Sequence, residues 1–545
     1  MLSKWWDMSR KNKETLKSLR KRVNWEIYED RVKLLFQLEP IFYEWKDPLP
    51  NLREIFQGDE IDRLLTDSAN LEDSEIGERF IVFVACSGYK DQPELDEDGD
   101  PVLQRTTALH HAARRKSENW WGLSRHLFRI FDRFDANYRD FFGCTHLHIA
   151  CQLRCPELVG QFLDRGQNPD CLPCKFVDPP LHLIIRTGVR LCRLFEMLLL
   201  GGADPNLPDT EGRAPLHAIC EKPYGAHRWV LDLIDFCRQY QKPLNFDARD
   251  ALGRTALHVA LIHDRRNLIE VLMLDTDMNL ADADGLTPLH IICKNCPYSR
   301  DLYLRWLLEL FKVNDLKRQR VLIDAQDKQG RTPLQWAVTN VWPGAVDLLL
   351  KRGADLSSFV FPSKICFGKG MASRNANFKL RLASGLMAIV ESLENAGYEL
   401  ELSDALTIME SFFEHKVFEK STSLVQRLHD DKKFEIEAKN KEIIQGLSLY
   451  DLIQLQPREV TKQFSFNDWF KNSEKFFNRV SIFYYEAFTA HLAEKLSRKF
   501  FLSWALVTFC ELIHFRLPIL CCDMMIENLP NEDLYNICLA ATGQN

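Results

Sequence analysis

The sequence predicts an all-α protein, a solenoid of helix-turn-helix repeats followed by a C-terminal helical domain. Three observations support this. A short phrase ending in Leu-His recurs seven times between residues 107 and 335. Helix-spaced apolar runs that end at Gly, such as Leu194–Gly201, lie between the copies. After residue 355 the phrase stops, but helical stripes of apolar residues continue. Self-similarity at periods of roughly 20–50 residues indicates a repeat architecture.

The copies of the phrase begin at residues 107, 145, 179, 214, 255, 287 and 332, and six of them end in His. The last copy has Gln335 at that position. The fuller copies read Thr-Pro-Leu-His, as at Thr287–His290. The Thr and His residues that we expect to hold the repeats together are Thr107, His110, Thr145, His148, His182, His217, Thr255, His258, Thr287, His290 and Thr332.

Each position of the phrase has a physical reason. Thr is a favourable N-cap, because its hydroxyl accepts a hydrogen bond from a free amide of the first turn. Pro suits the first helical position, where a missing N–H costs nothing. Leu points into the stack, and the two ring nitrogens of His can bridge backbone groups of neighbouring turns.

A Gly stands two residues before five of the seven copies, where a tight turn with positive φ is expected. The five residues are Gly143, Gly212, Gly253, Gly285 and Gly330. The copies at 107 and 179 have Arg105 and Val177 instead.

This phrase resembles the Thr-Pro-Leu-His signature of ankyrin repeats, and the spacings scatter around the ankyrin period of about 33 residues. Two spacings are longer and carry insertions, around Arg238–Asp250 and Phe311–Asp327. We expect these copies to stack with longer loops, because insertions in repeat arrays usually form loops on one face.

The resemblance divides the chain into four parts. Residues 1–74 form an N-terminal helical region, and residues 75–357 form the ankyrin repeats. The repeats comprise seven clear copies and one degenerate cap, whose second helix is expected at Ile81–Cys86. Residues 358–444 form a helical connector, and residues 445–545 form a C-terminal helical domain.

The last segment contains Leu-Pro at 517–518, then the apolar pair Met525-Ile526, then Leu529, then Asp-Leu at 533–534, then Ile537. This pattern resembles the F-box-like end of the PRANC domain found after ankyrin arrays in poxvirus and parasitoid-wasp proteins. The pattern departs from an F-box at Leu520, where Glu is common. The resemblance implies that an apolar helical face docks the small adaptor subunit of SCF-type cullin ubiquitin ligases. The residues of this F-box-like site are Leu517, Pro518, Met525, Ile526, Leu529, Leu534 and Ile537.

Composition and charge exclude several function classes. The formal net charge of −7 argues against nucleic acid as a partner. The apolar run Phe500–Cys510 is shorter than the roughly 20 residues that a membrane span needs, so it predicts a buried helix and no membrane contact. The N-terminus lacks the apolar core of a secretory signal. We therefore expect an intracellular, cytoplasmic protein. Nuclear import through the basic helix Arg10–Arg22 stays an alternative, although a solvent-exposed helix face is the favoured interpretation of this segment.

No motif predicts chemistry, a cofactor or a metal, so the chain is not expected to be an enzyme. The sequence contains neither a phosphate-binding loop nor a nucleophile elbow. The repeat explains six of the histidines. Two Cys-x-x-Cys pairs, Cys171/Cys174 and Cys293/Cys296, lie in different repeats, too far apart to share a zinc ion.

These features predict a protein-binding array whose concave face, built from turn tips and first helices, holds a folded protein. With the F-box-like segment, the chain would recruit that protein as a substrate to an SCF-type ubiquitin ligase. The alternative is a stand-alone ankyrin scaffold or inhibitor that sequesters its partner. In that case the C-terminal apolar residues would only close the end of a helical domain.

Overall fold

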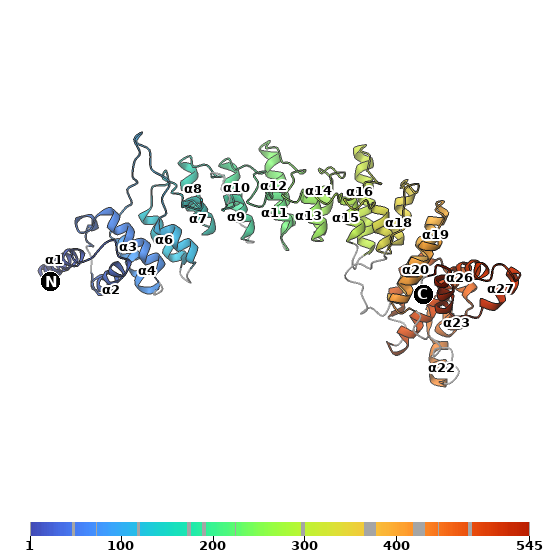
Figure 1. Cartoon of the computed structure of the whole chain (residues 1–545). Coiled ribbons are helices and arrows are strands. Elements are labelled where there is room, and N and C mark those ends of the chain that lie inside the picture. The colour runs from blue at the N-terminus through green and yellow to red at the C-terminus, as the bar shows by residue number, and fades with distance from the viewer. Residues whose placement is uncertain are drawn as a thin grey trace. The chain divides into compact units, whose positions relative to one another are not determined.

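The computed structural model describes residues 2–45, 49–71, 74–116, 120–171, 176–187, 192–223, 225–295, 300–363, 378–417, 431–444, 446–477 and 482–543. Contacts divide the chain into two compact units, Met1–Ala256 and Leu257–Asn545. Both are built from helices (Figure 1). The all-α fold class is confirmed, since the two strands among the described residues are only two and three residues long.

Unit 1 starts with four helices and a short 3-10 turn, and four helix pairs of the repeat type follow. The leading elements are α1 (Leu2–Arg20), α2 (Tyr28–Glu44), η1 (Leu52–Glu54), α3 (Gly58–Asn70) and α4 (Ser74–Cys86). The pairs are α5 (Ala108–Arg115) and α6 (Trp120–Ile130), α7 (His146–Gln152) and α8 (Pro156–Asp164), α9 (Pro180–Arg186) and α10 (Cys192–Leu200), and α11 (Pro215–Cys220) and α12 (Ala226–Gln239).

Helices α3 and α4 continue the stacking pattern ahead of the first copy of the phrase. Helix α3 packs on α4 and α5, and α4 packs on α6. Ile81 and Val84 of α4 are fully buried. The expected degenerate repeat thus consists of a helix pair that covers the apolar side of α5 and α6, as a capping unit must.

Unit 2 begins within α13 and holds three further repeat pairs. They are α13 (Ala256–Ile262) and α14 (Arg266–Met273), α15 (Pro288–Lys294) and α16 (Arg300–Lys317), and α17 (Pro333–Thr339) and α18 (Pro343–Lys351). The remaining elements are α19 (Phe378–Asn395), α20 (Leu402–Glu414), α22 (Lys432–Asn440), β1 (Glu442–Ile444), β2 (Leu447–Ser448), α23 (Leu449–Gln454), α24 (Pro457–Gln463), α25 (Phe466–Phe477), α26 (Ile482–Leu512), α27 (Ile519–Ile526) and α28 (Asn531–Ala541).

The two insertions lengthen helices, so the expectation of longer loops was wrong. Helix α12 has 14 residues and α16 has 18, whereas α14 and α18 have 8 and 9. The extra turns persist because apolar residues continue at helical spacing, and Trp306, Leu310 and Val313 of α16 are buried. In addition, Lys317 Nζ donates to the carbonyls of Met273 and Thr276, which lie at and after the end of the preceding second helix.

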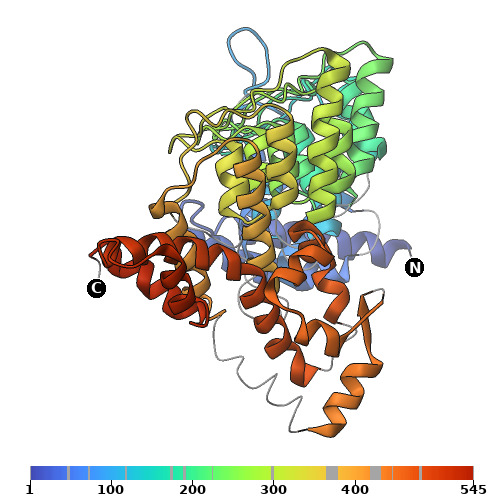
Figure 2. The same cartoon turned by 90° about the vertical axis from the view of Figure 1, so that its right-hand side faces the viewer.

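Helices α19 and α22 to α26 share one hydrophobic core. Leu380 of α19 and Phe434 of α22 pack in the same cluster as Trp469 of α25 and Phe488 of α26. This cluster contains residues from both sides of the expected boundary at 444/445. Figure 2 shows these helices in orange and red. The 31-residue α26 includes the apolar run Phe500–Cys510, and α19, α27 and α28 pack along α26.

The turn glycines adopt the conformation that the sequence predicts. All five have φ between +70° and +93°. Their surroundings differ. A Cβ added to Gly285 would lie 2.9 Å from the backbone nitrogen of Lys328, whereas one added to Gly330 would meet nothing within 4 Å. Gly285 therefore permits both a left-handed turn and close backbone packing on the next turn, and Gly330 permits only the first.

Gly285→Ala is expected to destabilise the protein more than Gly330→Ala. Both substitutions place a side chain in the left-handed region, at a cost of about 1–2 kcal/mol. Only Gly285→Ala also forces two backbone segments apart. Urea unfolding of the full chain measures the difference. Equal losses for the two variants would contradict the role of the close contact.

Candidate protein-binding surfaces

Five of the six histidines of the phrase connect their repeat to the next. In unit 1, Nε2 of His110 lies 3.0 Å from the carbonyl oxygen of Cys144, and His182 and His217 make the same contact with Arg213 and Arg254 at 2.8 Å. In unit 2, His258 Nε2 lies 3.0 Å from the Leu286 oxygen, and His290 Nε2 lies 3.1 Å from the Arg331 oxygen. Each acceptor is the residue just before the next copy of the phrase.

The other ring nitrogen caps the histidine's own helix. Nδ1 of His110, His148 and His290 accepts the backbone N–H of Thr107, Thr145 and Thr287 at 3.0–3.2 Å. These Thr residues are the N-caps of α5, α7 and α15. An Nδ1 acceptor requires the proton on Nε2, which suits the carbonyl partner of His110 and His290. One neutral imidazole therefore joins two successive helix pairs.

Three copies lack either the His or the Thr of the phrase, and they show which of these hydrogen bonds the repeats retain. Gln335 replaces His in the last copy, and its Oε1 accepts from Thr332 N–H at 2.8 Å while its Nε2 donates to Val360 O at 2.9 Å. In the copies that start with Pro179 and Ala214, Nδ1 of His182 and His217 has no partner. Pro179 has no N–H to donate. The Nε2 contact is retained in both copies, so the link between repeats does not depend on the cap.

Burial keeps these histidines neutral. It lowers the pKa of His110 and His148 to about 4, and it lowers the pKa of His290 as well. A protonated ring would direct a second N–H at the amide that Nδ1 accepts. Such groups stabilise the fold rather than transfer protons at neutral pH.

An aspartate at the start of each turn was missed in the sequence. Asp140, Asp209, Asp250, Asp282 and Asp327 stand three residues before the turn Gly. The Oδ1 atom of each accepts two backbone N–H groups of its own turn at 2.8–2.9 Å. The signal was visible as Asp-x-x-Gly before five copies of the phrase, and residues 96–99 form a sixth instance outside them. These hydrogen bonds fix the backbone of the turn, and the two residues between Asp and Gly stand at its tip.

The first copy has Arg105 where five of the others have the turn Gly, and Arg105 forms a half-buried charge cluster. Its guanidinium pairs with Asp62 and lies 3.0 Å from Asp91, which also accepts from the Tyr138 hydroxyl. Burial raises the pKa of Asp62 to about 6. This cluster anchors the chain that leads into residues 92–104.

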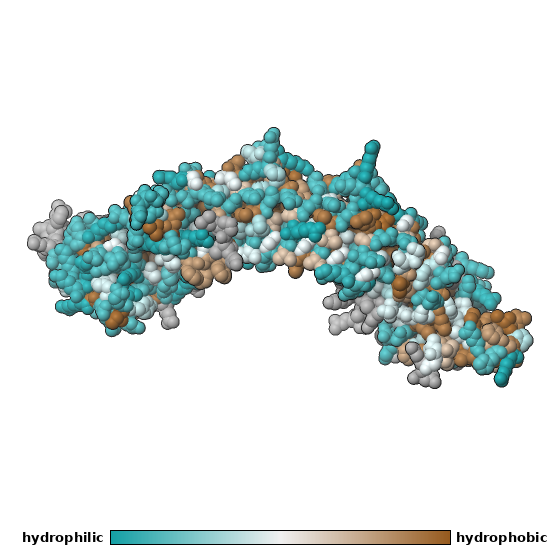
Figure 3. Space-filling view, turned by 45° about the horizontal axis from the view of Figure 1, so that its top comes forward, coloured by the Kyte–Doolittle hydropathy of each residue, from teal (hydrophilic) through white to brown (hydrophobic). Residues whose placement is uncertain are grey.

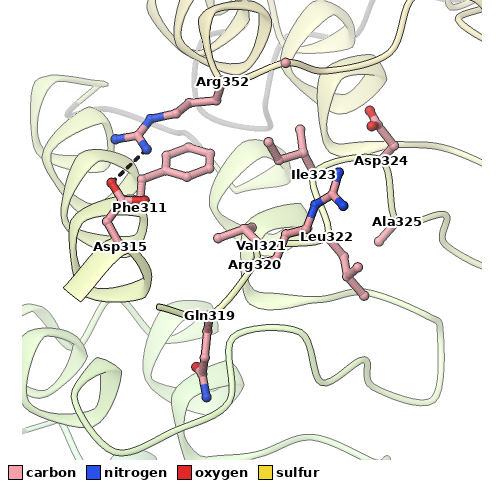
Figure 4. A pocket seen from close by; sticks show the side chains of 11 residues that line it. Phe311, Asp315, Gln319, Arg320, Val321, Leu322, Ile323, Asp324, Ala325 and Arg352 are labelled. Atoms are coloured by element: carbon pink, nitrogen blue, oxygen red, sulfur yellow. Dashed lines mark hydrogen bonds and ion pairs between the residues drawn. The ribbon is translucent and has the colours of Figure 1, made fainter. Parts of the chain in front are cut away.

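A cavity of about 620 Å³ lies in unit 2 between the end of α16, the loop after it and the end of α18 (Figure 4). Arg352 Nη1 lies 2.8 Å from Asp315 Oδ2, and its guanidinium carbon lies 4.8 Å from the Phe311 ring centroid. The rest of the lining is mixed, with Val321 and Ile323 beside Gln319, Arg320 and Asp324. His, Cys and Ser are absent from the described lining residues, and the carboxylates among them are those of Asp315 and Asp324.

The seven residues of the F-box-like site differ in exposure. Leu517 is 42% and Met525 57% exposed, and Pro518 is also exposed. Leu529 and Ile537 are half-buried, and Ile526 and Leu534 are buried. Four residues outside that set add exposed apolar surface, namely Phe515, Ile519, Leu520 and Met524 at 60–74%. Figure 3 shows hydrophobic residues gathered at the α27 end of unit 2. We call the exposed set from Phe515 to Met525 the α27 face.

No described helix is long and apolar enough to span a membrane. The described His, Cys, Asp and Glu form no group of three that could hold a metal ion. Cys171 and Cys293 are buried, and Cys174 and Cys296 lie outside the described residues.

His290→Gln is expected to preserve stability at pH 7.5 and to reduce its loss in acid. Gln reproduces both hydrogen bonds, as Gln335 does in the next copy, but it does not titrate. A neutral buried histidine has a lower pKa when folded than the ordinary value of about 6.5. The unfolded chain therefore binds more protons below pH 6.5, and stability falls as the pH drops from 6.5 toward 4, by up to about 1.4 kcal/mol per pH unit per histidine.

The measurement is urea unfolding of the full chain at pH 7.5 and pH 5, with His290→Ala as the matched control. The Ala variant leaves a buried N–H and a buried carbonyl unpaired, which costs about 1–3 kcal/mol each at either pH. A His290→Gln variant that loses as much stability as the Ala variant at pH 7.5 would contradict the hydrogen-bonding role.

Comparison with known proteins agrees with this geometry. The family description "Ankyrin repeats (3 copies)" matches residues 181–282 and 264–359. NF-kappa-B inhibitor alpha of Rattus norvegicus is 35% identical over 148 residues, which cover 25% of this chain and 44% of that protein. Transient receptor potential cation channel subfamily A member 1 of Homo sapiens is 28% identical over 215 residues, 39% of this chain and 18% of that protein.

An Arabidopsis thaliana protein named E3 ubiquitin-protein ligase KEG is 26% identical over 179 residues, 31% of this chain and 10% of that protein. The crystal structure of the ankyrin repeat domain of Bcl-3 matches with 23% identity and a TM-score of 0.34, over 46% of this chain and 99% of that domain. The chain spans less than half the length of the curated relatives named here. Residues 181–359 are ankyrin repeats, and the chain is an all-α ankyrin solenoid with a further helical region, a protein-binding scaffold.

Proposed function

We propose that the chain is a substrate-recruiting adaptor of an SCF-type cullin ubiquitin ligase. Its ankyrin repeats hold a folded target protein, and its F-box-like segment, residues 517–537, docks the small adaptor subunit of the ligase. The chain itself supplies no reaction. It acts as a tether that raises the effective concentration of the target near the ligase. The observation that carries the proposal is the exposure of the α27 face.

The α27 face is larger than a folded helical domain needs. Leu520 and Met524 are each 74% exposed, and Ile519 is 60% exposed. Isolated exposed apolar residues are ordinary, but a contiguous group marks an interaction surface. If the segment only closed the end of the domain, these residues would be turned into the core, as Ile526 and Leu534 are.

The buried members of the segment support the exposed ones. Cys522 and Ile526 on the inner side of α27 are buried, as are Leu534 and Cys538 of α28. Arg498 of α26 donates to the Glu527 carbonyl at 2.6 Å and to Asn531 Oδ1 at 2.9 Å, across the turn between α27 and α28. The face is thus held on two helices before any partner binds, which lowers the entropy cost of docking.

A second candidate is an inhibitor that sequesters its partner without a ligase. The observation in its favour is the 35% identity to a protein named NF-kappa-B inhibitor alpha. The relative named E3 ubiquitin-protein ligase KEG is compatible with the first candidate. In both candidates the array binds a folded protein, and only the adaptor-subunit contact separates them.

Co-purification of the full chain with the purified adaptor subunit tests the proposal. Leu517→Asp and Met525→Asp place a charge on exposed positions of the α27 face, and each is expected to weaken retention at least tenfold without unfolding the protein. Ile436→Asp is the matched control, since Ile436 is also 60% exposed but lies on α22. Wild-type protein that never retains the adaptor subunit would leave the inhibitor as the function.

A further inference from the structure

Three phenylalanines cluster on the surface of unit 1. Phe141 is 82% exposed, Phe176 is 70% exposed and Phe142 is 45% exposed. The ring centroids of Phe141 and Phe142 are 5.6 Å apart, and those of Phe142 and Phe176 are 6.2 Å apart, both edge-to-face. We call these three residues the aromatic tip cluster. Large aromatic rings are rarely left in water without a reason.

The fold of the turn does not require these rings. Phe141 and Phe142 are the two residues between Asp140 and Gly143. The same Asp-x-x-Gly turn forms elsewhere with Thr-Glu (residues 210–211), Ala-Leu (251–252), Ala-Asp (283–284) and Lys-Gln (328–329). The Phe pair therefore has no structural purpose that Thr-Glu would not serve.

The turn holds its rings in place before any partner arrives. Asp140 Oδ1 accepts the N–H groups of Phe142 and Cys144 at 2.9 and 2.8 Å. Arg114 pairs with Asp140, and its guanidinium carbon lies 4.7 Å from the Phe142 ring centroid. Rigid aromatic side chains bury large areas at low entropy cost, which is typical of the residues that dominate protein interfaces.

The base of an acidic hairpin is bound to the turn that carries Phe141 and Phe142. We use this name for residues 92–104, which fold back through a bridge between Leu95 and Pro101. Arg139 N–H donates to Leu103 O at 2.8 Å, and Gln104 Nε2 donates to Asp140 O at 3.1 Å, so the hairpin is bound to the Phe turn. It forms the light-blue loop that projects from unit 1 (Figures 1 and 2).

The hairpin is strongly negative. Its carboxylates are all exposed, and no Lys or Arg occurs between residues 91 and 104. Among the exposed cations of α5 and its C-cap, Arg114 contacts the Phe142 ring and pairs with Asp140, and Arg115 and Lys116 follow it. The five carboxylates are those of Glu94, Asp96, Glu97, Asp98 and Asp100. A partner that covers the rings therefore meets negative charge on one side, which favours a basic surface by charge complementarity.

We propose that the aromatic tip cluster and the acidic hairpin together bind a folded protein that has an apolar pocket flanked by Lys and Arg side chains. The rings fill the pocket, and the hairpin pairs with the basic rim. This inference rests on the proposed function in one respect, namely that the array binds a folded target. It adds where on unit 1 the target binds and what kind of surface the target carries.

The probe is a phage-displayed library of one small folded domain with a randomised surface, selected on the immobilised full-length chain. Dissociation constants of purified binders are then measured on the wild type and on three variants. F141T/F142E recreates the Thr210–Glu211 tip of a sister turn, so it is expected to fold. E97K/D98K reverses charge on the hairpin. Leu252→Thr is the matched control, because Leu252 is 56% exposed at another tip of the same unit.

The expected binders carry Lys or Arg around an apolar pocket. F141T/F142E should weaken them at least tenfold, E97K/D98K about three- to tenfold, and Leu252→Thr less than twofold. Raising the salt from 50 to 300 mM should weaken binding to the wild type more than binding to E97K/D98K, since salt screens exposed charge pairs.

Three outcomes overturn the inference. Binders that ignore F141T/F142E place recognition elsewhere on the chain, and binders without a basic rim contradict the charge argument. Self-association of the wild type that F141T/F142E abolishes would assign the cluster to a second copy. None of these outcomes affects retention of the ligase adaptor subunit through the α27 face. Failure here is therefore distinguishable from failure of the proposed function.

Discussion

The hydrogen bond from a buried histidine to the carbonyl that precedes the next repeat is the interaction on which the repeats depend. The first helix of each pair has only six to eight residues. Helices this short are not stable alone in water. They persist because one neutral ring satisfies polar groups of two successive copies at once. Gln335 can replace His because it offers the same acceptor and donor.

Because Asp and Gly fix the backbone of these turns, the residues at the tips can differ from turn to turn and can contact a partner. Asp and Gly hold the backbone of each turn, and the two residues between them contribute little to the fold. The chain uses this freedom unevenly. Most tips carry polar or small residues, one carries Leu252, and one carries the Phe pair beside the acidic hairpin. The insertions also follow packing rules, because their apolar residues extend α12 and α16 into the stack and do not lengthen loops.

The C-terminal helices are held together differently from the repeats. Helices α19 and α22 to α26 share a single core that contains Leu380 and Leu496, so no one helix pair among them is an independent unit. Helix α27 packs on α26 outside this cluster, where it buries one side and exposes the other. In the proposed function the exposed side of α27 binds the ligase. A recruiting protein needs this second surface in addition to the one that binds its target.

The sequence by itself determined the repeats, their caps, the positive-φ turn glycines and the all-α class, because each depends on residues within four or five positions of one another. The Asp-x-x-Gly signal was equally local and was missed. Which apolar residues of the last segment are exposed depends on the tertiary structure. Ile526 is buried, whereas Met525, its neighbour in the sequence, is exposed. The tertiary structure also decided that the base of the acidic hairpin lies beside the turn of Phe141 and Phe142. That proximity comes from one backbone hydrogen bond and one donated by the Gln104 side chain, between segments 36 residues apart, which no local pattern encodes.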